Sequence, residues 1–460
     1  MPEPVTIEQF YLACLAHASY LISSRGEAAV IDPQRDVDLY LEAAARQGAA
    51  IRHIIETHLH ADFVSGHLEL ARRTGAQIYL GEGSGADFPH RAVKEGDAIQ
   101  FGDCRLEFLQ TPGHTLESVC VVLTDLTQPA APRAVFTGDT LFVGDVGRPD
   151  LSPTHTPQQL ARELYHSLQG KLLRLPDATE IFPAHGAGSL CGRQMSAERS
   201  STIGRERRFN YALQAANAEE FVHLVADDLP PRPEYFGRDV ELNRHGAAAV
   251  GELPQLAALQ TAEVRALVAE GAIVLDTRPP ADFAAAHIPG SVNIALGGQF
   301  ASWAGRIVGL DRRLVLLAED AARVREAQVR LARVGIERVE GYVDDGIAGW
   351  LRGGGELESL LTVAAQDLAG LREERKSHIT VLDVREPSER EAGAIPGSIG
   401  IPLGQLPARL DEIGRSQTVV VHCKSGYRSS IAASLLQRSG VREVGTLTGG
   451  FDAWKAIAPR

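Results

Sequence analysis

The chain lacks an excess of basic residues, a dense set of cysteines and any long apolar run. Its 46 lysines and arginines are outnumbered by 59 aspartates and glutamates, and the net charge of −13 argues against nucleic acid or a membrane as a partner. The cysteines are odd in number and scattered, which indicates no disulfide framework; they are Cys14, Cys104, Cys120, Cys191 and Cys423. Because no apolar stretch reaches about 18 residues and no basic segment opens an apolar leader, we expect a protein of the reducing cytoplasm.

The first half of the chain reads as one α/β domain. At 460 residues the chain is too long for one ordinary core, so two to four domains are expected. Short apolar runs alternate with helical patterns up to about residue 245; residues 28–33 predict a strand and residues 37–47 a helix. Polar stretches fall at the strand ends, which fits a layered α/β sandwich. A small-residue segment, 246–251, is the expected first linker.

The second half of the chain contains an internal repeat. Residues 274–278, Val-Leu-Asp-Thr-Arg, and 287–291, His-Ile-Pro-Gly-Ser, recur as 381–385, Val-Leu-Asp-Val-Arg, and 394–398, Ala-Ile-Pro-Gly-Ser. Three glycines at 353–355 separate the two copies as a flexible joint. The sequence therefore predicts three domains, which are residues 1–245, 255–352 and 360–460.

Histidines and aspartates follow four separate apolar runs of the first domain. Residues 57–63 read Thr-His-Leu-His-Ala-Asp-Phe directly after a predicted strand, so two imidazoles and a carboxylate share one loop at alternate positions. Three later stretches each place a His or an Asp just past an apolar run: Thr-Pro-Gly-His-Thr at 111–115, Phe-Thr-Gly-Asp-Thr at 136–140 and Phe-Pro-Ala-His-Gly at 182–186. A His-x-His pair alone is also found as polar side chains on a protein surface, but the four stretches together predict a metal site.

These four stretches, in this order, resemble the metallo-β-lactamase superfamily, which implies an αββα sandwich. Members with two zinc ions read His-x-His-x-Asp-His in the first stretch; here the final position is Phe63, so the resemblance favours one ion. Within the superfamily the chain resembles the persulfide dioxygenases, a branch close to glyoxalase II. That resemblance implies a single non-haem iron(II) ion on His58, His114 and Asp139. Two imidazoles and a carboxylate on one face of the ion leave three positions open for substrate and O₂.

The same resemblance implies roles for the residues around this set. His60 and Asp62 are expected to orient ligands through hydrogen bonds, and His185 to contact bound substrate. The stretch 138–150 also looks like this branch, and within it Arg148 is a candidate to meet an anionic substrate; a structural loop arginine is the open alternative. Members that use glutathione often read Pro-Ala-His-Asp-Tyr where this chain has Pro-Ala-His-Gly-Ala, so the thiol that carries the persulfide stays open.

Cys191 follows His185 by six residues, so even a fully extended loop keeps the two within roughly 20 Å of each other. We therefore hypothesise that Cys191 lines the iron pocket or relays sulfur; a buried inert thiol is the alternative. The other cysteines of the first domain sit in apolar runs or beside strand signals, where core packing accounts for them.

Each copy of the repeat, about 100 residues long, resembles the rhodanese family, a small α/β fold with a central parallel sheet. In the second copy a strand leads into Cys-Lys-Ser-Gly-Tyr-Arg at 423–428, and a helix follows. Backbone N–H groups and the helix N-terminus favour a thiolate at Cys423 and hold its persulfide. Lys424 and Arg428 supply positive charge for a substrate such as thiosulfate. Asp383 and Arg385 are expected to form a structural ion pair.

The first copy lacks this cysteine. It reads Leu-Val-Leu-Leu-Ala-Glu-Asp-Ala at 314–321, so the nucleophile position is Ala318 or Glu319, depending on a one-residue shift. Without a thiol this copy cannot carry sulfur. We interpret it as a non-catalytic domain that acts as a spacer or an interface.

Together these resemblances imply an iron(II) persulfide dioxygenase joined to a sulfurtransferase. Its expected small-molecule partners are persulfides of glutathione or another thiol, O₂, thiosulfate and sulfite, and the expected context is sulfide detoxification or sulfur metabolism. A homo-oligomer is expected. The alternative is a zinc-dependent thioester hydrolase resembling glyoxalase II with an attached rhodanese, which requires a second metal ion. A third reading is a sulfur carrier in which only Cys423 matters.

Overall fold

The computed structural model describes residues 5–227, 229–375 and 378–457, which divide into two compact units. The first unit contains the chain up to Leu253 together with residues 332–335, and the second contains the remainder. The predicted domain ends at residues 1 and 460 lie outside the described residues, and the internal domain boundaries stay predictions.

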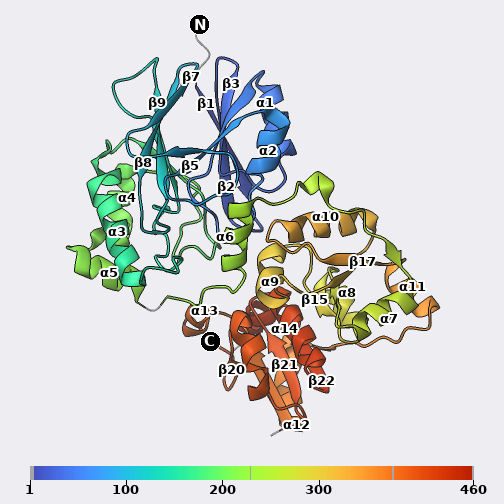
Figure 1. Ribbon diagram of the computed structural model, residues 1–460. Coiled ribbons are helices and arrows are strands. Elements are labelled where there is room, and N and C mark those ends of the chain that lie inside the picture. The colour runs from blue at the N-terminus through green and yellow to red at the C-terminus, as the bar shows by residue number, and fades with distance from the viewer. Residues whose placement is uncertain (1–4, 228, 376–377, 458–460) are drawn as a thin grey trace. The chain divides into compact units, whose positions relative to one another are not determined.

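The first unit is a sandwich of two six-stranded sheets (Figure 1). The first sheet contains, in spatial order, β1 (Thr6–Leu12), β2 (His17–Ser24), β3 (Glu27–Ile31), β4 (Ala50–Ile55), β5 (Gln77–Gly81) and β6 (Arg91–Val93). The second contains, in reverse spatial order, β7 (Ala98–Phe101), β8 (Cys104–Gln110), β9 (Val119–Asp125), β10 (Ala134–Gly138), β11 (Glu180–Pro183) and β12 (Ser201–Thr202). Both sheets contribute side chains to one core, so they pack face to face.

Helices cover the outer faces of both sheets. Strand β9 shows why: Val121 points into the core between the sheets, whereas Cys120 and Val122 point to the other face, so β9 is apolar on both sides and both must be covered. The first sheet is covered by α1 (Asp38–Arg46) and α2 (His67–Thr74), the second by α3 (Pro157–Gly170), α4 (Ile203–Phe209) and α5 (Ala218–Ala226). The predicted αββα sandwich is confirmed.

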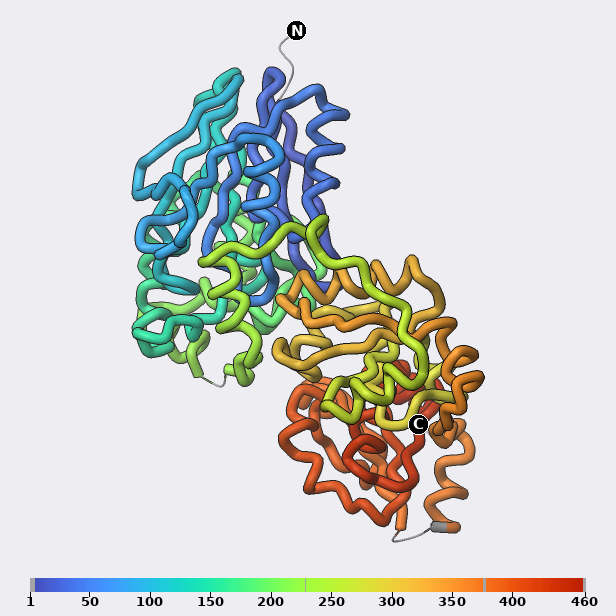
Figure 2. Tube along the Cα trace, turned by 45° about the vertical axis from the view of Figure 1, so that its right-hand side comes forward, coloured from blue at the N-terminus to red at the C-terminus, as the bar shows by residue number. Residues whose placement is uncertain are grey.

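The second unit contains two five-stranded sheets with one shared topology, and the chain can be followed through each of them by colour in Figure 2. The first sheet has the order β13 (Ala258–Leu259), β17 (Val339–Val343), β16 (Leu314–Leu317), β14 (Ile273–Asp276) and β15 (Val292–Asn293). The second has the order β18 (Leu361–Val363), β22 (Glu443–Leu447), β21 (Thr418–His422), β19 (Ile379–Asp383) and β20 (Ile399–Gly400). All pairs are parallel, and the equal order confirms the repeat.

The helices of the second unit also repeat. The first copy contains α7 (Thr261–Ala269), α8 (Pro280–Ala285), α9 (Phe300–Ile307), α10 (Ala321–Ala332) and α11 (Gly346–Arg352). The second copy contains α12 (Leu368–Arg375), α13 (Pro387–Glu391), α14 (Tyr427–Arg438) and α15 (Gly450–Ile457). The remaining helices are α6 (Phe236–His245) in the first unit and the 3-10 helices η1 (Leu172–Arg174), η2 (Ala212–Gln214), η3 (Val250–Glu252), η4 (Ala365–Asp367) and η6 (Leu403–Glu412). No helix of the described chain has the length and apolar character that crossing a bilayer requires.

Candidate metal centre and cysteine loop

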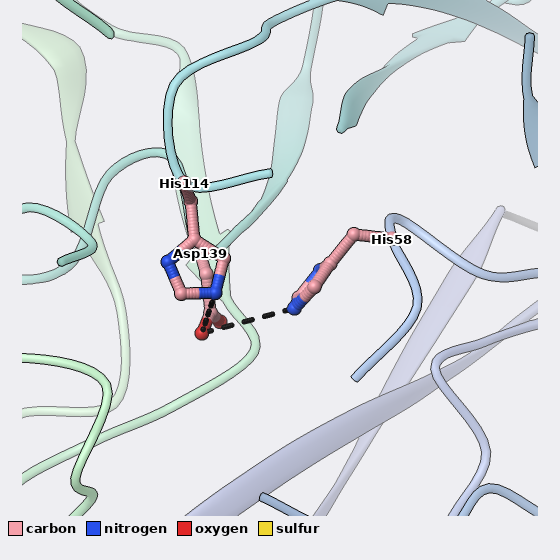
Figure 3. A group of neighbouring side chains, drawn as sticks. All are labelled: His58, His114 and Asp139. Atoms are coloured by element: carbon pink, nitrogen blue, oxygen red, sulfur yellow. Dashed lines mark ion pairs between the residues drawn. The ribbon is translucent and has the colours of Figure 1, made fainter. Parts of the chain in front are cut away.

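Three buried side chains from three separate loops converge on one point (Figure 3). His58 follows β4, His114 follows β8 and Asp139 follows β10. The Nε2 atoms of His58 and His114 lie 3.9 and 3.3 Å from Oδ2 of Asp139. One donor atom of each residue lies within 4.8 Å of the other two, and Nε2 of His114 has no hydrogen-bond partner among the described residues. This donor set fits one transition-metal ion.

Hydrogen bonds behind the two imidazoles fix which ring nitrogen faces the point of convergence. Nδ1 of His58 lies 3.0 Å from the Thr57 hydroxyl, which itself donates to Asp32 over 2.9 Å. Nδ1 of His114 donates to the Arg148 carbonyl over 3.0 Å. Because Nδ1 carries the proton in both rings, Nε2 keeps its lone pair toward the carboxylate. Burial lowers the pKa of both imidazoles, which keeps them in the neutral form that binds a metal.

Asp32 anchors the loop that carries these ligands. Its carboxylate accepts a hydrogen bond from the Thr57 amide over 2.7 Å and lies 3.2 Å from Nε2 of His60, whose Nε2 is also 3.3 Å from Glu56. The backbone of Asp32 adopts the left-handed conformation, with φ of 50°. Burial alone would lower the pKa of His60, but the two carboxylates outweigh burial and raise it well above its usual value. The orienting role of His60 stays a prediction, and these are the contacts that such a role needs.

A second set of three donors lies beside the first. One atom each of His60, Asp62 and His185 lies within 4.8 Å of the others. Nε2 of His185 is 3.5 Å from Asp62 and 3.7 Å from Asp139. Burial would lower the pKa of His185, but Asp139 and Asp62 raise it to about 9. The ring of Phe63 packs against that of His60 with centroids 4.3 Å apart, so an apolar group fills the position of the missing imidazole.

Two residues that shape this region carry no recognisable signal in the sequence. Asn243 of α6 donates to the carbonyls of His60 and Phe63 over 2.8 Å and accepts from the Ser65 amide over 2.8 Å, which ties the metal-site loop to the helix. His17 at the start of β2 is fully buried, and its ring centroid lies 4.0 Å from that of Phe63. Both act across long sequence separations, up to 183 residues for Asn243, where no spacing motif exists.

Arg148 is held by structural partners. Its guanidinium donates twice to Asp150, over 2.6 and 2.8 Å, and also to the carbonyls of Leu190 and Pro230. Its amide donates to the carbonyl of Cys191 over 2.9 Å. A contact between Arg148 and an anionic substrate stays a prediction, and the observed contacts are those of the structural alternative.

Cys191 is 1% exposed and lies at the same site as the candidate ligands. One donor atom each of Asp139, His185 and Cys191 lies within 4.8 Å of the others. Burial raises the pKa of Cys191 well above its usual value, and the carboxylates of Asp62 and Asp139 raise it further. Gly147 also approaches the site closely, because a Cβ there would lie 1.9 Å from the carbonyl oxygen of Asp139 and 3.0 Å from Nδ1 of His114.

The candidate sulfur-carrying loop follows β21 directly. Sγ of Cys423 accepts a hydrogen bond from the Gly426 amide over 3.1 Å and lies 3.6 Å from the Ser429 hydroxyl. Lys424 is exposed, whereas Arg428 forms two hydrogen bonds to Glu389 of α13, over 2.6 and 2.8 Å. Two cations are predicted to bind the substrate. Of these, Lys424 is exposed and has no carboxylate partner among the described residues, whereas Arg428 is paired with Glu389.

Other parts of the same domain contact the loop. The amide of Phe451 donates to the Cys423 carbonyl over 2.8 Å. Asp383 and Arg385 form an ion pair 2.7 Å long, and Asp383 lies 3.7 Å from His422, the residue before Cys423. A Cβ at Gly450 would lie 2.6 Å from the Cys423 carbonyl, so the close approach requires glycine there.

Strand register decides which residue of the first copy corresponds to Cys423. Asp276 of β14 lies opposite Leu317 of β16, as Asp383 of β19 lies opposite His422 of β21. The residue after Leu317 is Ala318, so Ala318 rather than Glu319 stands at the cysteine position.

The three converging donors predict the loss of bound metal on substitution. We expect His58→Ala, His114→Ala and Asp139→Ala each to reduce iron bound after anaerobic loading and desalting to less than about a tenth of wild type, since each removes one of three donors. His223→Ala, on the exposed face of α5, is the matched control and keeps full occupancy. Two irons per chain in the wild type, halved by Asp62→Ala, would contradict the single-ion prediction.

Comparison with known proteins accounts for most of the chain. A family model described as the metallo-beta-lactamase superfamily matches residues 12–185, and one described as the rhodanese-like domain matches residues 260–352 and 364–457. The persulfide dioxygenase ETHE1, mitochondrial, of Bos taurus is 33% identical over 248 residues, which are 52% of this chain and 88% of that protein. A hydroxyacylglutathione hydrolase of Rhodopseudomonas palustris is 32% identical over 49% of this chain and 80% of its own length.

A solved structure shares a large part of the architecture. The metallo-beta-lactamase from Staphylococcus aureus subsp. aureus COL is 32% identical, covers 74% of this chain and 99% of its own, and superposes with a TM-score of 0.67. With the site geometry above, these matches lead to one conclusion: the chain belongs to the metallo-beta-lactamase superfamily, in the group of the ETHE1-type persulfide dioxygenases, and carries two rhodanese-like domains after that domain.

Proposed function

We propose that this enzyme oxidises low-molecular-weight thiol persulfides with O₂ to sulfite in its first domain and exchanges sulfane sulfur with thiosulfate through Cys423. The observation that carries the proposal is the convergence of His58, His114 and Asp139 on one point in a chain that also carries an intact rhodanese loop. Supporting it, a relative that is 33% identical over 52% of this chain is named a persulfide dioxygenase.

The proposed cofactor is a single iron(II) ion held by His58, His114 and Asp139. The two neutral imidazoles and the carboxylate match the donor set of non-haem iron oxygenases, and the buried Nε2 of His114 is without a protein partner among the described residues. When bound, iron supplies the redox chemistry that lets O₂ react with a closed-shell sulfur anion. The overall reaction, R–S–SH + O₂ + H₂O → R–SH + SO₃²⁻ + 2 H⁺, moves four electrons from the outer sulfur to O₂.

The proposed roles of the neighbouring side chains follow from their positions. His185 lies 3.7 Å from Asp139, and its raised pKa favours a protonated ring that donates a hydrogen bond to an anionic persulfide. His60 supplies a buried positive charge behind the ligand loop. Phe63 excludes water on that side of the site, because its ring is 1% exposed.

In the rhodanese domain the proposed step is a sulfur transfer at Cys423. The thiolate attacks the outer sulfur of thiosulfate; the new S–S bond forms as the old one breaks, and sulfite leaves with its electron pair. The Gly426 amide, 3.1 Å from Sγ, stabilises the anionic sulfur before and after transfer. The reverse step, in which sulfite takes the sulfur to give thiosulfate, uses the same groups, so one site serves either direction.

The alternative function is a zinc thioester hydrolase, and the hydroxyacylglutathione hydrolase relative favours it. A hydrolase of this kind would use the second donor set, His60, Asp62 and His185. Thioester hydrolysis requires no oxidant, so a dependence of the activity on O₂ distinguishes the two functions.

Oxygen uptake tests the proposed function. We expect anaerobically purified, iron(II)-loaded protein given glutathione persulfide to consume O₂ and release sulfite in a 1:1 ratio. Cys423→Ser retains this activity, because the oxidation occurs in the first domain, whereas His58→Ala loses at least about 99% of it. No uptake with glutathione, cysteine or coenzyme A persulfide, together with hydrolysis of a glutathione thioester by the zinc-loaded protein, would favour the hydrolase.

Cys191 is proposed to take part in sulfur handling at the metal centre. We expect Cys191→Ser to change the ratio of sulfite to thiosulfate, since its sulfur lies within 4.8 Å of Asp139 and His185 and is the only thiol of the described residues in that set. The control is Cys104→Ser, a buried core cysteine of β8. Unchanged oxidation rate and product ratio would assign Cys191 to packing.

Glu389 is expected to restrict the use of thiosulfate. A dianionic donor competes with the Glu389 carboxylate for Arg428, so Glu389→Gln should raise kcat/KM for thiosulfate about three- to tenfold, mainly through a lower KM. Glu391→Gln, at the exposed end of the same helix, is the matched control. An unchanged KM in Glu389→Gln would show that Arg428 does not meet the donor.

A further inference from the structure

One face of α14 forms hydrogen bonds to the cysteine-less copy. The Tyr427 hydroxyl donates to the Ala295 carbonyl over 2.9 Å, and at the other end of the helix Arg438 donates to the Gly290 carbonyl over 2.6 Å. Between them, Ser430 and Ser434 are both buried and both bond to one residue, Asn293. The spacing of three and four residues places all four side chains on one side of the helix.

All the N–H donors of Asn293 of β15, in its side chain and its backbone, are engaged. Its Nδ2 donates to the carbonyls of Asp276 and Arg278, over 2.9 and 3.0 Å, which fixes the orientation of the amide. Its Oδ1 therefore faces α14 and accepts from the Ser430 hydroxyl over 2.6 Å, while its backbone amide donates to Ser434 over 3.1 Å. Asn293 is 0% exposed, so none of these bonds competes with water.

The same helix presents its N-terminus to Cys423. Gly426, which precedes α14, donates its amide to Sγ over 3.1 Å, and Ser429 in the first turn lies 3.6 Å from Sγ while its hydroxyl donates to the Gly426 carbonyl. Ser430 follows Ser429 directly. A displacement of the first turn of α14 therefore moves the Gly426 amide and the Ser429 hydroxyl relative to the sulfur.

The contact has no counterpart in the second copy. Asn293 pairs with Asp276 in the sheet as Gly400 pairs with Asp383, so glycine stands at the position equivalent to Asn293. Glycine has no side chain to offer a neighbouring helix. The first copy, which lacks the cysteine, thus holds α14 of the second copy in place.

We propose that Asn293 is a positioning residue for Cys423, and that the cysteine-less copy is a structural part of the sulfur-transfer site rather than a spacer. Asn293 fixes the first turn of α14 through Ser430, and this turn holds the amide of Gly426 on the reactive sulfur. The proposal rests on Cys423 being the reactive thiol of the proposed function, but its test follows the thiol directly and does not require sulfur transfer.

The charged and titratable groups around Cys423 lie on four strands and helices and in the loop after β21, and the test leaves all of them in place. They are His422 of β21, Lys424 of the loop, Arg428 of α14, Glu386, Glu389 and Arg390 in and beside α13, and Asp383 and Arg385 at the end of β19. Any change in the pH profile of Cys423 reactivity is then due to the neutral contacts of the helix.

The test measures alkylation of Cys423 by iodoacetamide between pH 5 and 10 in the full chain, with mass spectrometry of the peptide that contains it. Ser430→Ala deletes one hydroxyl and leaves the bonds of Asn293 to its own copy intact. We expect the rate at pH 7 to fall about two- to fivefold and the profile to move to higher pH, the size of a helix N-terminal contribution. Asn293→Ala should give the same shift, and the double variant no further one.

Arg438→Gln is the matched control, because it alters the same face of the same helix at the end far from Cys423. It should leave the alkylation profile unchanged. A lower unfolding temperature with a wild-type profile in Ser430→Ala, or an equal shift in Arg438→Gln, would overturn the proposal. Should Asn293→Ala fail to fold, Ser430→Ala decides the question alone.

Discussion

The geometry of the candidate metal centre depends on the contacts of the Asp32 carboxylate. It fixes the Thr57 amide and hydroxyl, and through that hydroxyl it sets the tautomer of His58; it also lies against the His60 imidazole. Burying a carboxylate destabilises the fold unless hydrogen-bond donors or a positive charge lie against it. Removing any one of these partners therefore leaves Asp32 as a destabilising buried charge. The other two candidate ligands, His114 and Asp139, follow strands of the second sheet, and the face-to-face core brings them close to His58.

The fold and the four stretches with a His or an Asp were within reach of the sequence, because both rest on local patterns, whereas the choice of His58, His114 and Asp139 as one donor set came from the family resemblance. Apolar runs gave the strands, and a His or Asp just past a run marks the end of a sheet, where such residues meet. The predicted helix at 37–47 and the strand at 28–33 match α1 and β3 closely. The roles of Asn243 and Glu389 could not be predicted from the sequence. Asn243 binds carbonyls, and Glu389 binds the Arg428 guanidinium, at positions distant in sequence, where no spacing pattern links the partners.

The family resemblance indicated which arginines belong to the two sites, but not which carboxylates those arginines pair with. Arg428 was expected to offer positive charge to a substrate, and the structure adds a carboxylate, Glu389, that occupies it. Arg148 likewise meets Asp150 and two carbonyls. Both arginines are long side chains whose partners depend on which loops surround them, and those loops are set by the tertiary fold. The one-residue ambiguity at Ala318 was resolved by strand register, which is a property of the sheet and not of the motif.

The left-handed backbone of Asp32 has a consequence for how the protein acquires its metal. A residue other than glycine in that conformation costs on the order of 1 to 3 kcal/mol, and surrounding contacts must hold it there. The contacts of Asp32 therefore hold the loop in a conformation that by itself lowers the stability of the fold. An ion that binds the native state and not the unfolded chain offsets that loss. In the proposed function the metal ion thus stabilises the fold as well as serving as a cofactor.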